Sequence, residues 1–96
     1  MITVRIKSSD RPEKRLTAIF YKDNRKYKKV HFGQKSGNTY VDHGDDIKKV
    51  NYIKRHRVRE NWNDPYSAGA LSRYILWNKK SLDESVRDYK KRFGFS

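Results

Sequence analysis

Residues 16–32 read LTAIFYKDNRKYKKVHF, and this stretch decides the fold. Residues 16–21 are rich in β-branched and aromatic side chains, and the following Lys22-Asp23-Asn24 is a turn signal. Residues 25–32 are therefore predicted to return as a second strand, antiparallel to the first. The stretch indicates a β-hairpin around which the rest of the chain is organised.

A third strand is predicted over residues 2–7, where Ile2, Val4 and Ile6 alternate with polar residues. Pairing the three strands gives an antiparallel sheet with one apolar face. The other face is predicted to carry Arg5, Lys7, Tyr27, Lys29 and His31. This face is either the solvated side that such sheets usually have, or a platform of cationic and aromatic groups that binds nucleic acid.

Helical periodicity begins after a link of irregular sequence. Residues 34–44 are predicted to form a loop, with a short irregular strand around Tyr40 and Val41 as the alternative. A helix is predicted from Asp45 to about Arg59, because two acidic residues at its start suit the positive end of the helix dipole. One side of this helix is expected to pack inward through Ile47, Val50, Ile53 and Val58. Another side brings Lys48, Arg55 and Arg59 together near Tyr52.

Two further helices are predicted. Asp64 is a candidate N-cap and Pro65 the first residue of a helix that runs to about Trp77. Ser81 and Glu84 form a capping-box pattern before a last helix over residues 82–93. The chain is therefore predicted to be a single α+β domain over residues 1–96, with a sheet in residues 1–33, a loop in residues 34–44 and three helices in residues 45–93.

The charge balance points to a polyanionic partner. Lys and Arg number 24 against 11 Asp and Glu, which gives a formal net charge of +13. Such a charge destabilises a small compact body by self-repulsion unless a partner screens it. Nucleic acid is the first candidate and an anionic membrane the second, whereas the alternative is a protein that is merely very soluble. We expect nucleic acid, with DNA favoured over RNA, and no membrane.

The composition also suggests self-association and gives no sign of an enzyme. Hydrophobic residues make up 34% of the chain, so the core is thin and a homodimer is expected. The absence of cysteine excludes disulfides, thiol catalysis and cysteine-based metal sites. Neither a Gly-x-Ser-x-Gly elbow nor a phosphate-binding glycine loop occurs. We expect a non-catalytic protein without a cofactor.

One acidic stretch keeps a catalytic alternative open. Residues 42–46 read DHGDD and hold four possible metal ligands. Together with His31 they allow the hypothesis of a magnesium- or zinc-dependent nuclease centred on His31, Asp42 and His43. Acidic residues before a helix are ordinary capping chemistry, and the spacing matches no known ligand motif, so no metal site is predicted.

The cationic groups are the predicted contacts to nucleic acid. They lie on the polar face of the sheet and on one side of the first long helix: Arg5, Lys7, Tyr27, Lys29, Lys48, Tyr52, Arg55 and Arg59. Such residues position phosphates and give little sequence specificity. The alternative is a structural or adaptor protein that binds a protein partner through its aromatic helical half, with Trp62 as the exposed contact.

The sequence also resembles a known family. YIKRHRVRENWNDPYSAGALSRYILWNKKSLDESVRDYKKRF (residues 52–93) and FYKDNRKYKKVHFGQKSGNTYVDHGD (residues 20–45) are similar to an uncharacterised family of small basic proteins of nucleocytoplasmic large DNA viruses, with relatives in chlorella viruses, marseilleviruses and mimiviruses. The resemblance covers about residues 20–93. It implies a viral origin and hence a virion component or a factor acting on viral DNA, located in the virion or in the cytoplasm or nucleus of the infected cell.

Overall fold

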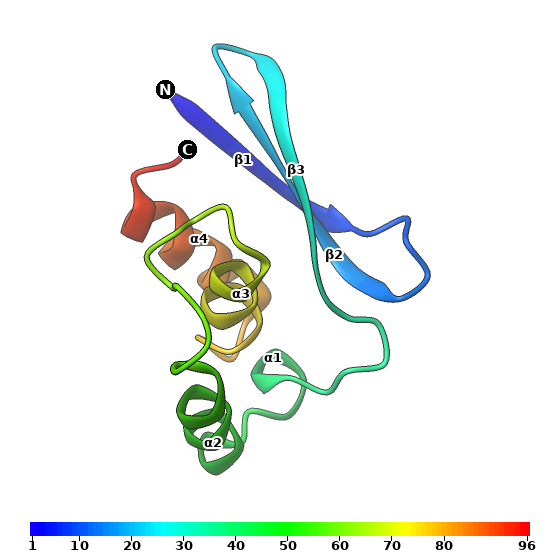
Figure 1. The fold of residues 1–96 in the computed structure, drawn as a ribbon, viewed down its shortest axis with the longest axis vertical. Helices are drawn as coiled ribbons and strands as arrows, with labels where there is room; N and C mark the ends of the chain where they lie inside the picture. The colour runs from blue at the N-terminus through cyan, green and yellow to red at the C-terminus, as the bar shows by residue number, and fades with distance from the viewer.

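The first third of the chain forms a three-stranded antiparallel sheet in the computed structural model, which describes residues 1–96 (Figure 1). The middle strand, β2 (Lys14–Lys22), pairs with β1 (Ile2–Ser8) on one side and with β3 (Arg25–Gln34) on the other. Helices make up most of the remaining chain. The predicted α+β class and its N-terminal sheet are confirmed.

The turn between β2 and β3 is built by two residues in left-handed conformations. Asp23 has a φ of 52° and Asn24 a φ of 67°. Asp and Asn tolerate this region well, and a two-residue turn with both φ angles positive matches the right-handed twist of the strands it joins. The turn signal in the sequence therefore marks the turn of the hairpin.

A β-bulge in β3 overturns one prediction about the faces of the sheet. The pairing of β3 with β2 skips Tyr27 where it passes from Phe20 to Tyr21. An extra residue of this kind re-aims its side chain, and the Tyr27 ring lies edge-on to Tyr66 at 6.0 Å between centroids. Tyr27 therefore leaves the face that carries Lys29, where strict alternation had placed it.

A short helix lies where a loop or an irregular strand was predicted, so that prediction was wrong. α1 (Tyr40–His43) is a single turn preceded by Thr39. The Asp42 carboxylate accepts the backbone N–H of Thr39 at 2.8 Å, and Gly44, with a φ of 62°, ends the turn. The local hydrogen bond, which a scan for periodicity does not detect, makes this turn helical.

α2 (Asp46–His56) follows at once and begins as predicted. The Asp45 side chain caps it by accepting hydrogen bonds from the backbone N–H groups of Ile47 and Lys48. The regular helix ends at His56, and residues 57–59 continue as turns. α2 is therefore about one turn shorter than the sequence suggested.

α3 (Ala68–Leu71) runs directly into a π-helical turn over Ser72–Leu76. This helix was predicted from Pro65, but its N-cap is Ser67, whose Oγ accepts the N–H of Ala70 at 3.0 Å. The difference has a local cause in the turn before α3.

In that turn Asp64 accepts the N–H of Tyr66 at 3.0 Å instead of capping a helix. The turn lets the Tyr66 ring reach Phe20 of the sheet, with centroids 4.8 Å apart in an edge-to-face contact. Packing against the sheet thus outweighs the local preference for an earlier helix start.

α4 (Leu82–Phe93) agrees with its prediction. Ser81 caps it by accepting the N–H of Glu84 at 3.4 Å, and Gly94 ends it with a φ of 69°. Its buried side carries Tyr89, which is fully buried. Local capping signals and the hydrophobic spacing agree here, so the element was readable from sequence.

The core lies between one face of the sheet and the layer of α3, the π-helical turn and α4 (Figure 1). Its central residues are Val4, Leu16, Ala18, Phe20, Phe32, Leu71, Ile75, Leu76 and Tyr89. Figure 1 places α2 at the opposite end of the molecule from the β2–β3 turn. None of the helices is long and apolar enough to cross a membrane.

Replacement of Tyr89 by Phe is expected to lower the free energy of unfolding by about 1 kcal/mol. The Tyr89 hydroxyl donates to the Pro65 carbonyl at 2.6 Å and so ties α4 to the turn before α3. Urea unfolding measures the change. Tyr74→Phe is the matched control because the Tyr74 hydroxyl makes no hydrogen bond, and an equal loss in both variants would contradict this role for Tyr89.

Candidate nucleic-acid interface

An aromatic stack fixes α2 against the π-helical turn. The Tyr52 ring lies parallel to Trp77, with centroids 4.3 Å apart and an angle of 5° between the ring planes. It also stacks on His56 at 4.2 Å. Tyr52 is only 7% exposed, and burial raises the pKa of its phenol. Tyr52 is therefore used in packing α2 against the π-helical turn, and its predicted contact with nucleic acid stays a prediction.

Polar contacts fix the same side of α2. The Tyr40 hydroxyl of α1 donates to the Asp46 carboxylate at 2.5 Å. The Lys49 ammonium donates to the Asn78 carbonyl at 2.7 Å and lies 4.7 Å from the centre of the Tyr40 ring. The inward side of α2 is thus aromatic and polar.

The aliphatic side of α2 faces solvent instead of the core, so the predicted inward packing was wrong. Ile47 is 74% exposed, Val50 48% and Val58 79%, whereas Ile53 is half-buried. Large flat rings bury more area than aliphatic side chains and gain from stacking. The stack around Tyr52 therefore sets the rotation of the helix.

This rotation places one side of α2 beside a hollow of about 630 Å³. Six residues line it: Asn38, Lys48, Asn51, Lys54, Arg55 and Trp77. Each of these side chains offers N–H donors, and none is a carboxylate. We call this hollow with its six residues the α2 hollow. Its chemistry suits phosphate oxygens, which are acceptors only.

Sequence reasoning found two of these residues and missed four. Lys48 and Arg55 were predicted and line the α2 hollow, whereas Arg59 is exposed in the turn beyond the helix and does not line it. The missed residues are Asn38, Asn51, Lys54 and Trp77. The useful signal was the spacing of Tyr52 and His56, four residues apart, which puts two rings on one side of a helix and suggests an aromatic docking face.

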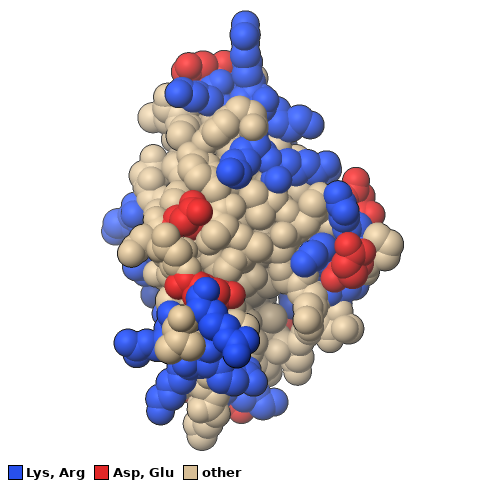
Figure 2. All heavy atoms as spheres, viewed as in Figure 1, with Lys and Arg blue, Asp and Glu red and all other residues tan.

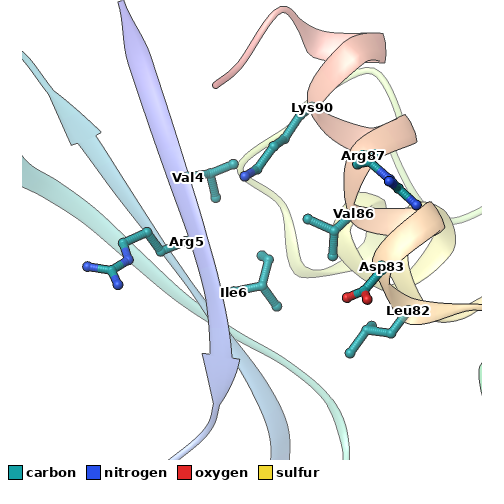
Figure 3. A pocket seen from close by; sticks show the side chains of 8 residues that line it. All are labelled: Val4, Arg5, Ile6, Leu82, Asp83, Val86, Arg87 and Lys90. Atoms are coloured by element: carbon teal, nitrogen blue, oxygen red, sulfur yellow. The ribbon is translucent and has the colours of Figure 1, made fainter.

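The second predicted group lies on the face of the sheet away from the helices. In the register of the sheet, Arg5 of β1 and Lys29 of β3 both lie opposite Ile19 of β2. Lys7 of β1 lies opposite Thr17, two residues along β2. A hollow of about 480 Å³ lies between β1 and α4; Arg5 is among the residues that line it, and in Figure 3 the Arg5 side chain lies on the side of β1 away from α4. We call Arg5, Lys7 and Lys29 the sheet cations.

Almost all the cations of the molecule lack a carboxylate partner. Of the 24 Lys and Arg residues, only Arg15 and Arg92 form ion pairs with acidic side chains, namely Asp42 and Asp88. The strands carry two, three and four Lys or Arg residues and no Asp or Glu. In Figure 2 the blue atoms gather over the strand ends and over α2, with some red atoms beside them at both places and a mostly tan band between the two.

Comparison with known proteins assigns this arrangement to a family. Residues 4–56, more than half of the chain, match a model described as "Family of unknown function (DUF5754)". The chain belongs to this family. The match includes most of the sheet and all of α1 and α2. It therefore covers the sheet cations and five of the six residues of the α2 hollow, all except Trp77. The family match begins at residue 4, whereas the resemblance found in the sequence began at about Phe20.

A viral relative was found as well. An uncharacterized protein of Acanthamoeba polyphaga mimivirus is 31% identical over 80 residues, which cover 77% of this chain and 80% of the relative. The predicted resemblance to an uncharacterised family with mimivirus relatives is therefore confirmed. No solved structure is significantly similar to the chain.

Two residues of the nuclease alternative, His31 and Asp42, are engaged elsewhere in this family member. His31 shares a hydrogen bond of 2.8 Å with the Thr17 hydroxyl, and both oxygens of Asp42 accept from Arg15. No three His, Asp or Glu side chains of the chain come together as metal ligands. The hypothesis built on His31, Asp42 and His43 thus has no ligand cluster to support it.

Trp62, the contact of the adaptor alternative, is also used within the fold. Its indole N–H donates to Glu60 at 2.8 Å, and the Arg73 guanidinium lies 5.5 Å from the ring centre. Burial lowers the pKa of Arg73, but its guanidinium still donates to the Trp77 carbonyl at 2.8 Å. The Trp62 side chain is half-buried, so little of its surface is exposed to a partner.

The Arg15–Asp42 pair predicts a dependence of stability on pH. Arg15 donates two hydrogen bonds to Asp42, at 2.6 and 2.8 Å, which hold the pKa of this carboxyl well below its usual range with help from Thr39. The contribution to stability is complete above the unfolded pKa of about 3.9 and is lost as the pH falls towards the lower folded pKa.

Asp42→Asn is therefore expected to lower the free energy of unfolding at pH 6 by ~1 kcal/mol, because the pair is partly exposed. The variant is also expected to lose less stability than the parent between pH 4 and pH 2. Urea unfolding at four pH values measures both effects. The control is Asp83→Asn, which removes an exposed carboxylate that forms no ion pair. If Asp42→Asn lost as much stability between pH 4 and pH 2 as the parent, the Arg15–Asp42 pair would not be the cause of the pH dependence.

Proposed function

We propose that this chain is a non-catalytic nucleic-acid-binding protein that contacts phosphates through the α2 hollow and the sheet cations. The observation that carries the proposal is the lack of carboxylate partners for all but two of its 24 Lys and Arg residues. Cations left unpaired by the fold are available to a polyanion, and each one that meets a phosphate releases counterions.

The geometry of the α2 hollow supports phosphate contacts more than base reading. Lys48, Lys54 and Arg55 carry full charges, and Trp77 and the two amides add uncharged donors at its wall. Long exposed side chains hold backbone phosphates without a fixed fork aimed at a base edge. We therefore propose binding with little sequence specificity, with DNA favoured over RNA.

The viral relative supports a role in a large DNA virus. A small basic protein of the type we expected in this group would act as a DNA-associated virion component or as a factor on viral DNA during infection. We propose the virion, or the cytoplasm or nucleus of the infected cell, as its location. These proposals are supported by the mimivirus relative and by the charge, and a search for the protein in purified virions tests them.

Neutralisation of the α2 hollow is expected to weaken binding and to flatten its salt dependence. The variant Lys48→Gln/Lys54→Gln/Arg55→Gln removes three charges. The slope of log affinity against log salt is expected to fall by about 0.9 for each lost phosphate contact, and affinity at low salt by roughly 10- to 100-fold. Fluorescence anisotropy with duplex DNA, single-stranded DNA and RNA of one length, from 50 to 300 mM salt, gives both values.

A matched control separates this site from charge alone. Arg11→Gln/Arg87→Gln/Lys91→Gln removes the same charge from exposed positions outside both cation groups. Equal losses in the two triple variants would show that net charge, and not the α2 hollow, governs binding. Failure of the parent protein to bind any nucleic acid at 50 mM salt would end the proposal.

A further inference from the structure

The outer edge of β1 is covered at one end only. The Ser96 N–H donates to the Ile2 carbonyl, and the Val4 N–H donates to the Ser96 carbonyl, each at 2.9 Å. This is the pattern of a parallel strand, in which one residue bonds to the two residues that flank its neighbour. Ser96 therefore occupies the position of a fourth strand and shows that this edge accepts an extended backbone.

The edge beyond Val4 has no partner. The backbone groups of successive residues in a strand point to alternate sides, and those of Ile2 and Val4 point away from β2. The N–H and C=O of Ile6 therefore point the same way, and they form no hydrogen bond there. The Val4 carbonyl and both backbone groups of Ile6 are thus free to pair with a further strand.

This free edge lies beside the hollow of about 480 Å³ between β1 and α4 (Figure 3). Its apolar wall consists of Val4, Ile6, Leu82 and Val86, and the last three of these keep part of their surface exposed. The lining of α4 runs from Leu82 to Lys90, which is about 12 Å of helix. That length matches about four residues of an extended chain. We call this hollow with the free edge the β1–α4 groove.

The free backbone groups restrict what can fill the β1–α4 groove. Another extended polypeptide matches donors and acceptors that recur every second residue, and its alternate side chains would meet the apolar wall. Phosphate oxygens are acceptors only, so a nucleic acid backbone cannot satisfy the carbonyls of Val4 and Ile6. The hydrogen bonding therefore favours a protein segment over nucleic acid at this place.

The other edge of the sheet is less suited to a further strand. β3 carries the bulge at Tyr27 and four Lys or Arg residues, and both features discourage pairing at an edge. β1 pairs with β2 in an unbroken register from Ile2 to Ser8. The regular edge is thus the one that borders a hollow.

The charge of the groove selects the segment. Arg87 and Lys90 line it and form no ion pair, and Asp83 is the only carboxylate there. A second copy of this chain is disfavoured, because each copy carries a net charge of +13 and its strands contain no Asp or Glu. We propose that the β1–α4 groove binds an extended, acidic segment of a partner protein by strand addition. This inference does not depend on nucleic-acid binding.

A synthetic peptide tests the inference on the parent protein. The probe is a capped peptide of alternating valine and glutamate, about seven residues long, which is enough to span the groove. Fluorescence anisotropy measures its affinity. Amide hydrogen exchange by NMR is expected to slow by roughly 10-fold at Ile6 when the peptide is saturating. The Val4 amide is the internal control, because it is already bonded to Ser96.

Two N-methylated forms of the peptide separate strand addition from attraction by charge. One form is methylated at the valines and the other at the glutamates, and their charge is equal. Residues of one kind face β1 and those of the other kind face away. One form is therefore expected to bind roughly 10-fold more weakly than the other, because it loses the backbone hydrogen bonds.

Charge reversal tests the acidic character of the segment. Arg87→Glu/Lys90→Glu is expected to weaken binding of the glutamate peptide by roughly 10-fold and to strengthen binding of a peptide with lysine at the same positions. The matched control is Arg11→Glu/Lys91→Glu, which changes the net charge equally at exposed positions outside the groove. Circular dichroism checks that both variants fold.

Each outcome decides for or against the inference. Absence of binding by the unmodified peptide, or equal affinities of the two N-methylated forms, overturns strand addition. Equal losses in the two charge-reversed variants overturn the assignment of the acidic segment to this groove. The variant Lys48→Gln/Lys54→Gln/Arg55→Gln is expected to keep the difference between the N-methylated forms, so failure of nucleic-acid binding and failure of this inference are distinguishable.

Discussion

The stacking of Tyr52 between Trp77 and His56 is the contact on which the surface of this molecule depends. The stack fixes the rotation of α2, since the helix is otherwise held mainly by the polar contacts of Asp46 and Lys49. Because the rings face inward, the aliphatic side chains of the helix face outward and its cations border the α2 hollow. A rotation of half a turn would bury the aliphatic residues and turn the proposed phosphate-binding side chains elsewhere.

The elements that could be predicted are those whose signals are local. Three strands and α4 were predicted from alternation, a two-residue turn and a cap, each of which acts within a few residues. The bulge at Tyr27, the late start of α3 and the rotation of α2 depend on partners far along the chain, namely Tyr66, Phe20 and Trp77. Hydrophobic periodicity ranks isoleucine and valine above tyrosine, so it could not anticipate that an aromatic contact would decide which side of α2 is buried.

The candidate site was predictable to a similar extent. Lys48 and Arg55 were identified because a helical wheel places them together on one side of the helix, and the structure places that side at the α2 hollow. The sheet cations were identified by strand alternation, which holds outside the bulge. The packing role of Tyr52 was missed because the sequence does not show which side of a helix meets the core. Asn38 and Trp77 reach the α2 hollow from other segments, so only the tertiary structure could add them.

The distribution of carboxylates explains why so much positive charge stays unpaired. Asp45 caps α2, Asp46 and Glu60 accept from aromatic side chains, and Asp88 binds Asn78 as well as Arg92. These acidic groups define helices and turns, and the chain has only 11 Asp and Glu residues against 24 Lys and Arg residues, so most of the cations form no ion pair with a carboxylate. The fold therefore retains its self-repulsion, and its thin core has little stability to set against it. A polyanion that binds only the folded chain would stabilise it by about 2.7 kcal/mol at a free concentration 100 times the dissociation constant. Binding and folding of this chain would then be linked, because the same unpaired cations that oppose compaction in the free protein would attract the partner that relieves the repulsion.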